Sequence, residues 1–443
     1  MEEQAEKKSE QISDPGKRQD LDQKKEERQP SPFRNGSISK ISDRLLLAGL
    51  LIGNILLVWR HFSSPFTYVF SAPVVPLLAS TLGFTGVEYD IAIRWILLAF
   101  FIAGPLTLYL FVKELSGRKS SAFIAAILYS LPVFRSRFEA LSVSGDGAHI
   151  AALTLVPLAA FFLMRFLKKG SFPAAIATSI AVLLVALTSP FGLFVLLAVM
   201  LVVTFSEMLL GTGRIRFLRF VLILIISGGL SAFWYNPEFV RLSLVSTPGR
   251  AVIAAIKNLI PLSFFILPVL GTFGFLIFDK RAHLQPLFVA LGLTFLFGLI
   301  SFAGGLARFA VSTQSRYLPE VSLSLSILWG VVGVFVYDLL GYLPQSKWFP
   351  VPVARRKILK TAVLVIFFLT IIILAVAVPY RETISGRSGR VIAGVNESVV
   401  IDIGEIRERT GGVHRILGYV ITSLTAVATT GLYFRLRKEE GEI

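Results

Sequence analysis

The chain has 443 residues, of which 54% are hydrophobic and only 16% are charged, and its mean hydropathy is +0.72. A soluble domain of this length does not need so much apolar surface, whereas helices that face lipid need apolar residues on every side. The net charge of +16 fits basic loops beside a membrane, so we expect no nucleic-acid partner. Because the chain has no cysteine, disulfides, thiolate metal sites and cysteine nucleophiles are excluded.

Residues 1–43 mix acidic and basic side chains and contain almost no apolar ones. Such a segment cannot bury enough apolar surface to fold, which predicts a disordered cytoplasmic tail. It also lacks the basic start, apolar core and small-residue cleavage site of a signal peptide. We therefore expect the first apolar segment to be an uncleaved span.

Runs of apolar residues long enough to cross a bilayer recur through the rest of the chain. They predict an all-α, polytopic transmembrane bundle with about twelve spans. The expected spans lie near 44–59, 91–112, 120–134, 149–167, 172–188, 190–211, 217–235, 258–278, 284–303, 320–341, 358–379 and 414–434. We divide them into a main transmembrane module over 44–341 and a C-terminal pair over 342–443 with an external loop at 380–413.

Basic residues in alternate loops set the expected orientation. They are Lys113, Arg118, Lys119, Arg165, Lys168, Lys169, Arg214, Arg216, Arg219, Lys280, Arg281, Lys347, Arg355, Arg356, Lys357, Arg435, Arg437 and Lys438. Placing them inside makes both termini cytoplasmic in a multi-pass protein of the cell membrane. The apolar run 64–84 would invert every later loop if it crossed, so we expect interfacial or re-entrant helices there, in the first external loop.

Two acids, Glu88 and Asp90, precede the second span, with Arg94 one turn further on. Paired carboxylates hold hard divalent cations through oxygen ligands, and a single carboxylate can act as a general base. The alternative is an acidic helix start, because acids are favoured electrostatically in the first turn of a helix.

The segment 142–149 carries a glycine-flanked acid, Asp146, and a histidine, His149, at the mouth of the fourth span. Glycines let a backbone approach a ligand closely, and residues three apart share a helical face. The alternative is that Asp146 only caps the following helix. Capping gives no reason for His149, whose burial at a membrane boundary is costly unless it has a partner.

A third pattern, Arg316, Tyr317 and Glu320, leads into the tenth span. An arginine fork suits phosphate, and an adjacent tyrosine can stack on a sugar or a base. The alternative is an interfacial anchor of aromatic and basic residues. Arg135 and Arg137 lie on the same expected external side. The predicted substrate-binding residues are therefore His149, Arg316, Tyr317, Glu320, Arg135 and Arg137.

These features together resemble the GT-C superfamily of lipid-dependent membrane glycosyltransferases. The resemblance covers roughly 44–340, beginning with the order of a tail, one span and a large external loop. The sequence segments that carry it are Ala92–Trp95, Tyr109–Lys113, Ala122–Pro132, Gly145–His149 and Ser315–Glu320. The last two also resemble uncharacterised archaeal and bacterial membrane proteins, among them the family labelled 6-pyruvoyl-tetrahydropterin-synthase-related.

The resemblance implies a glycosyltransferase that takes a polyprenyl-phosphate-linked sugar from the bilayer on the extracytoplasmic face. Asp90 or Glu88 would be the base, Asp146 and His149 would support Mg²⁺, Mn²⁺ or the acceptor, and Arg316 would face the lipid phosphate. Its partners would be the lipid-linked donor and membrane lipids, and the sequence does not identify a protein partner. The stretch Arg60–Pro65, where family members usually carry an acid, has none. A degenerate binding or scaffold protein, or a lipid or polysaccharide transporter, is therefore the alternative.

Overall fold

The computed structural model describes residues 42–59, 62, 72–131, 136–142, 146–210, 213–245, 284–302, 318–342 and 411–441. Within these ranges the chain forms helices and no strand, which confirms the predicted all-α class. The longer helices are α3 (Asp43–Val58), α5 (Tyr89–Ser116), α8 (Gly147–Lys169), α9 (Phe172–Thr188), α10 (Pro190–Leu210), α11 (Gly213–Ser231), α14 (Gln285–Phe302), α16 (Leu318–Tyr342) and α19 (Gly412–Gly441). The shorter ones are α4 (Val74–Gly83), α6 (Lys119–Ser130), α7 (Ser136–Ser142) and α12 (Pro237–Val245).

Four described helices are long and apolar enough to cross a membrane: α5, α8, α10 and the segment Gly412–Phe434 of α19. The chain is therefore a membrane protein, as its composition predicts. α9 matches its predicted span, whereas α6 ends at Ser130 instead of residue 134. Pro132 explains the early end, because proline disfavours a helical conformation in the residue before it. The spans predicted at 258–278 and 358–379 lie outside the described residues.

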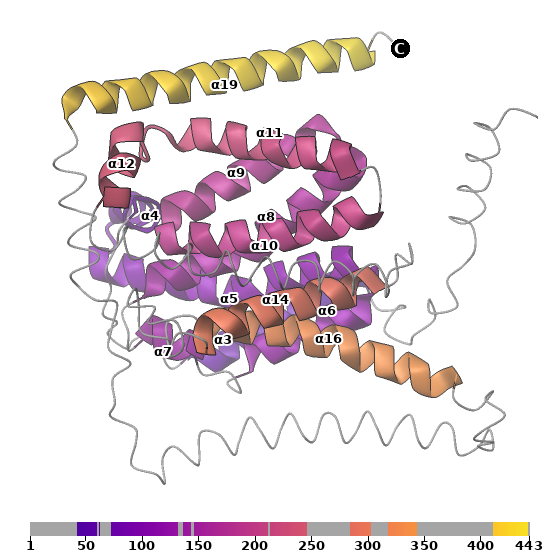
Figure 1. Ribbon diagram of the computed structural model, residues 1–443. Coiled ribbons are helices and arrows are strands. Elements are labelled where there is room, and N and C mark those ends of the chain that lie inside the picture. Colours follow the sequence, from indigo (N-terminus) through magenta and orange to yellow (C-terminus); the bar gives the residue numbers. More distant parts are fainter. Residues whose placement is uncertain are drawn as a thin grey trace, which may run out of the picture. The chain divides into compact units, whose positions relative to one another are not determined.

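Helices α5 and α8 pack against each other at the centre of the described bundle. α5 also contacts α4 and α6, and α8 contacts α9 and α10. α16 packs against α6 and α14, while α19 lies along α11 and touches α12 (Figure 1). Helix α8 ends at Lys169 because the next residue, Gly170, has a left-handed conformation (φ 68°), which suits glycine.

The apolar run 64–84, which was predicted to hold interfacial or re-entrant helices, contains a short helix. α4 has only 10 residues, too few to cross a bilayer. Val75 and Ala79 are fully buried, while Leu77 on another face is exposed. Residues 64–71 of that run lie outside the described ranges.

Contacts between helix ends place many basic residues at one end of the bundle, which we call the basic end. Lys113 at the end of α5 bonds Asp43 at the start of α3 (2.6 Å), and Arg165 near the end of α8 bonds Glu114 (3.1 Å). Tyr433 near the end of α19 stacks on Phe172 at the start of α9, with ring centroids 5.9 Å apart. The start of α3 and the end of α19 therefore share this end, as the predicted topology requires.

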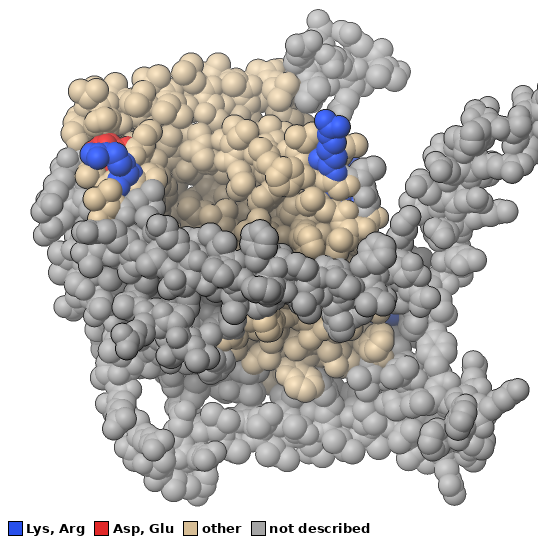
Figure 2. Space-filling view, in the orientation of Figure 1, with Lys and Arg blue, Asp and Glu red and all other residues tan. Residues whose placement is uncertain are grey.

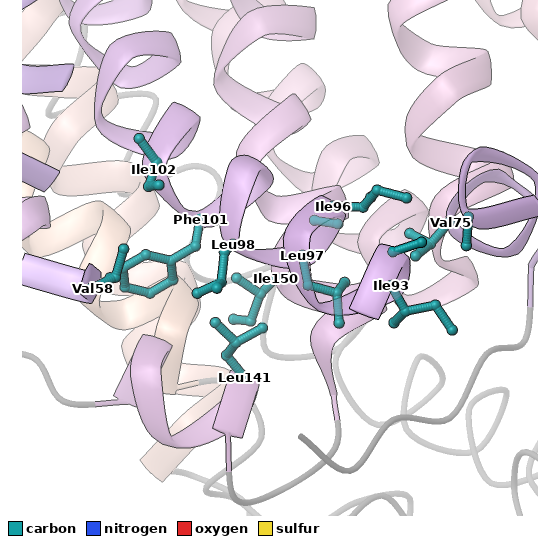
Figure 3. Close-up of a cluster of buried hydrophobic side chains, with 13 residues drawn as sticks. Val58, Val75, Ile93, Ile96, Leu97, Leu98, Phe101, Ile102, Leu141 and Ile150 are labelled. Atoms are coloured by element: carbon teal, nitrogen blue, oxygen red, sulfur yellow. The ribbon is translucent and has the colours of Figure 1, made fainter. Parts of the chain in front are cut away.

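The opposite end, which we call the site end, contains the starts of α5, α8 and α16 together with α7. A buried apolar cluster joins its helices, including Ile93 and Leu97 of α5, Leu141 of α7, Ile150 of α8 and Val75 of α4 (Figure 3). Burial of these side chains fixes the positions of the first turns that carry the polar residues described next.

Candidate functional site

His149 and Glu320 form a buried pair at the site end. The His149 Nε2 atom lies 2.5 Å from Glu320 Oε1, and the two side chains are 1% and 0% exposed. The pair joins the first turn of α8 to the first turn of α16 across 171 residues of sequence. Two residues that the sequence predicted as substrate-binding are thus brought together, in direct contact with each other.

The position of His149 depends on how α8 begins. A Cβ added at Gly147 would lie 2.6 Å from Leu97 Cδ1, so the absence of a side chain at this position gives Leu97 of α5 its room against the start of α8. Asp146 is the N-cap residue, and its carbonyl accepts hydrogen bonds from the amides of His149 (3.1 Å) and Ile150 (3.2 Å). Its side chain makes no capping hydrogen bond, so Asp146 occupies the predicted cap position through its backbone alone.

Arg137 of α7 extends into the bundle and is only 2% exposed. Its Nη1 and Nη2 atoms donate to the carbonyls of Tyr129 and Phe101, both at 2.9 Å. The guanidinium carbon also lies 3.8 Å from the centroid of the Tyr129 ring and 4.3 Å from that of Phe101. These cation–π contacts and hydrogen bonds connect α7 to α5 and α6. Arg137 is therefore near the predicted site, but its described contacts are with the protein.

Glu88 and Asp90 are exposed at the start of α5. Glu88 holds the N-cap position, and Asp90 lies in the first turn, as the acidic-start alternative also predicts. The preceding Gly86 has φ 85°, which turns the chain sharply between α4 and α5 and suits glycine. The structure thus places these two carboxylates in reach of solvent, at the same end as the buried His149–Glu320 pair.

Three predicted site residues, Arg135, Arg316 and Tyr317, lie outside the described residues. Among the residues that are described, no three histidine or acidic side chains converge as a metal site would require. Because His149 Nε2 contacts Glu320, we assign no metal-dependent step to Asp146 and His149.

The sequence interpretation gave no role to Tyr129, whose buried hydroxyl has no hydrogen-bond partner in the described part of the chain. A tyrosine at the end of an apolar helix, close in sequence to two arginines, is the signal that could have identified it.

The fold and these contacts define a polytopic α-helical membrane protein with a buried histidine–glutamate pair and two exposed carboxylates at one end of its bundle. No protein-family model and no curated protein matches the chain. Among solved structures, the chain is similar to ArnT from Cupriavidus metallidurans, crystallised with undecaprenyl phosphate. The sequence identity is 16%, the alignment covers 88% of this chain and 77% of ArnT, and the TM-score is 0.35. This is a distant likeness between helical membrane proteins.

Proposed function

We propose that the chain is a membrane glycosyltransferase that moves a sugar from a polyprenyl-phosphate carrier to an acceptor hydroxyl at the site end. The observation that carries the proposal is the His149–Glu320 pair, buried at the same end as the exposed Glu88 and Asp90. Buried ionisable groups are costly in a membrane protein, so their presence here favours a functional site. The GT-C resemblance of the sequence supports the same chemistry.

In this reaction, Asp90 or Glu88 takes the proton of the acceptor hydroxyl. The hydroxyl oxygen forms a bond to the anomeric carbon of the donor sugar. The bond from that carbon to the phosphate oxygen breaks, and the carrier leaves as polyprenyl phosphate with the electron pair. His149 and Glu320 hold the starts of α8 and α16 in place beside the reacting groups, while Arg316 is proposed to bind the phosphate.

The test is transfer of labelled sugar from polyprenyl-phosphate donors by the purified full chain in lipid, with and without Mg²⁺ or Mn²⁺. The variants are Glu88→Gln, Asp90→Asn and Asp146→Asn. We expect loss of the general base to lower turnover by about 100-fold or more. Glu114→Gln is the matched control, because Glu114 is an acid of the basic end that bonds Arg165.

Two results would contradict the proposal. The first is a folded wild-type protein that transfers no sugar from any donor tested. The second is an equal loss in Glu114→Gln, which would attribute the effect to general instability rather than to a base at the site end. Dependence on Mg²⁺ or Mn²⁺ that disappears in Asp146→Asn would assign Asp146 to a metal.

Transport of a lipid-linked sugar is the second candidate, and the titratable character of the His149–Glu320 pair favours it. A pair that links two helices can couple a proton to a change in their packing. Both residues, however, lie in first turns and not at the middle of a span, where transporter sites are found. In vesicles, donor crossing that depends on a pH gradient and is lost in Glu320→Gln would favour transport over transfer.

A further inference from the structure

Glu207, near the end of α10, is a buried carboxylate at the basic end, where α8, α10, α11 and α14 meet. It is 1% exposed. Its oxygens lie 2.9 Å from Arg216 Nη1 of α11 and 3.8 Å from Lys168 Nζ of α8. It also accepts a 2.7 Å hydrogen bond from Gln285 Nε2 of α14. One carboxylate therefore fixes two cations that come from different helices.

The inward contacts of α11 go beyond this ion pair. Arg216 also donates to the backbone carbonyl of Glu207. Arg219 donates to the Leu167 carbonyl at the end of α8 (2.6 Å) and lies over Gly170, where any side chain would collide with its guanidinium. These bonds hold both arginines in place, so little of their conformational freedom remains to be lost on binding a ligand.

The cations of this region outnumber its acids. The last two turns of α8 and the first two turns of α11 contribute Arg165, Lys168, Lys169, Arg214, Arg216 and Arg219. The carboxylates that they bond are Glu114 and Glu207. Lys169 and Arg214 are exposed and make no ion pair with a described residue. We call these six cations the basic corner. Figure 2, which has the orientation of Figure 1, shows Lys and Arg atoms in blue at the right, near the position where α11 begins in Figure 1.

Apolar side chains alternate with the arginines of α11. Ile215, Phe217 and Leu218 are 48%, 48% and 58% exposed. A helix start that presents large apolar groups beside arginines suits the boundary where acyl chains meet headgroups. A free anion in water would gain nothing from those three side chains.

We propose that the basic corner binds the phosphate headgroup of an anionic phospholipid. Lys169, Arg214 and the outer side of Lys168 supply the charge, while Ile215, Phe217 and Leu218 contact the acyl chains. Glu207 is the positioning residue, because it fixes Lys168 of α8 and, through Arg216, the start of α11 that carries Arg214. The site is at the opposite end from the proposed transferase site and does not depend on that function.

The test is binding of phosphatidylglycerol by the full chain in detergent, measured by native mass spectrometry and by the shift of the thermal midpoint, with phosphatidylcholine as the neutral lipid. We expect wild type to prefer phosphatidylglycerol. Lys169→Gln with Arg214→Gln should weaken that binding roughly 30-fold, because each cation near an anionic headgroup contributes on the order of 1 kcal/mol. Added salt should weaken it further.

Arg241→Gln with Arg415→Gln is the matched control, since it removes the same formal charge from helices α12 and α19 at the other end. The control should bind phosphatidylglycerol like wild type. Equal loss in the control, or no preference over phosphatidylcholine, would overturn the proposal. An equal shift of the thermal midpoint with inorganic phosphate alone would identify the ligand as a free anion and would also overturn the proposal. Binding of polyprenyl phosphate without binding of phosphatidylglycerol would identify a site for the sugar carrier, and this result overturns the proposal as well.

Discussion

His149 and Glu320 illustrate how a single contact can define the distance between two helices that are far apart in sequence. The atoms that join them are 2.5 Å apart, and neither side chain is more than 1% exposed. Removing one partner leaves the other buried in an apolar bundle, whereas replacing both with apolar groups of similar size leaves no buried charge. The two types of substitution therefore separate a structural role from a chemical one.

We expect Glu320→Leu alone to lower the free energy of unfolding by about 3 kcal/mol. The double variant His149→Leu with Glu320→Leu should recover most of that loss, because it leaves no unpaired polar group. Thermal unfolding of the purified variants in one detergent is the measurement. A double variant as unstable as the single one would show that the pair is not what keeps α8 and α16 together.

Asp43 gives a pH-dependent prediction at the start of α3, outside the predicted span. Hydrogen bonds from Lys113 and Tyr109 lower the pKa of its carboxyl below the usual value. Its contribution to stability is therefore complete above the pKa of about 3.9 in the unfolded chain and is lost as the pH falls through the lower folded pKa. The side chain is 35% exposed, so screening keeps the effect below about 1 kcal/mol.

Wild type should consequently lose more stability than Asp43→Asn as the pH is lowered from 6 to 3. Comparing the two unfolding midpoints at each pH removes the contribution of the other carboxyl groups, which both proteins share. Parallel curves would mean that Asp43 does not have a lowered pKa in the folded protein.

At the scale of helices, α19 packs on α11 through small residues. A Cβ on Gly418 would lie 2.5 Å from the Ala232 carbonyl oxygen, and one on Gly229 would lie 2.3 Å from Thr425 Oγ1. Thr422 Oγ1 accepts a hydrogen bond from the Phe233 amide and donates one to the Gly229 carbonyl. Close approach of backbones and hydrogen bonds between helices replace the hydrophobic effect, which lipid weakens within the membrane.

Two glycines of α19 make this packing testable. Gly418→Ala should loosen α19, because the nearest atom belongs to the backbone and cannot move aside easily. Gly431→Ala, with nothing within 4 Å of its Cβ, should be neutral or stabilising because alanine favours a helix. Hydrogen exchange of the α19 amides is the measurement; equal protection in both variants would contradict the packing.

For the whole molecule, the basic end and the site end should face opposite sides of the membrane. The chain has no cysteine, so single cysteines can be introduced without removing others. Thr85→Cys and Ser171→Cys place one exposed thiol at each end. In intact cells we expect a membrane-impermeant maleimide to label Thr85→Cys, and Ser171→Cys only after permeabilisation. The reverse pattern would place the termini outside.

Most of the described helices could be predicted from the sequence, because a helix in lipid needs an unbroken apolar run. α9 and α10 agree with prediction to within one residue. Side-chain partners could not be predicted in the same way: His149 and Glu320 were each singled out, but no periodicity relates residues so far apart. Arg137 shows the same limit, since an arginine beside a span gives no sign that it turns inward towards Phe101 and Tyr129. The division at residues 341 and 342 stays a prediction.

The long sequence separation within the His149–Glu320 pair has a consequence for biosynthesis. α8 leaves the ribosome before Glu320 has been translated, so its histidine must enter the bilayer without the acceptor that it has in the finished protein. A neutral imidazole is the form that can do this at least cost, because charge is expensive in lipid. The packing of α8 is thus completed only when α16 follows it, and a nascent chain that stops between them lacks the carboxylate that His149 contacts in the finished protein.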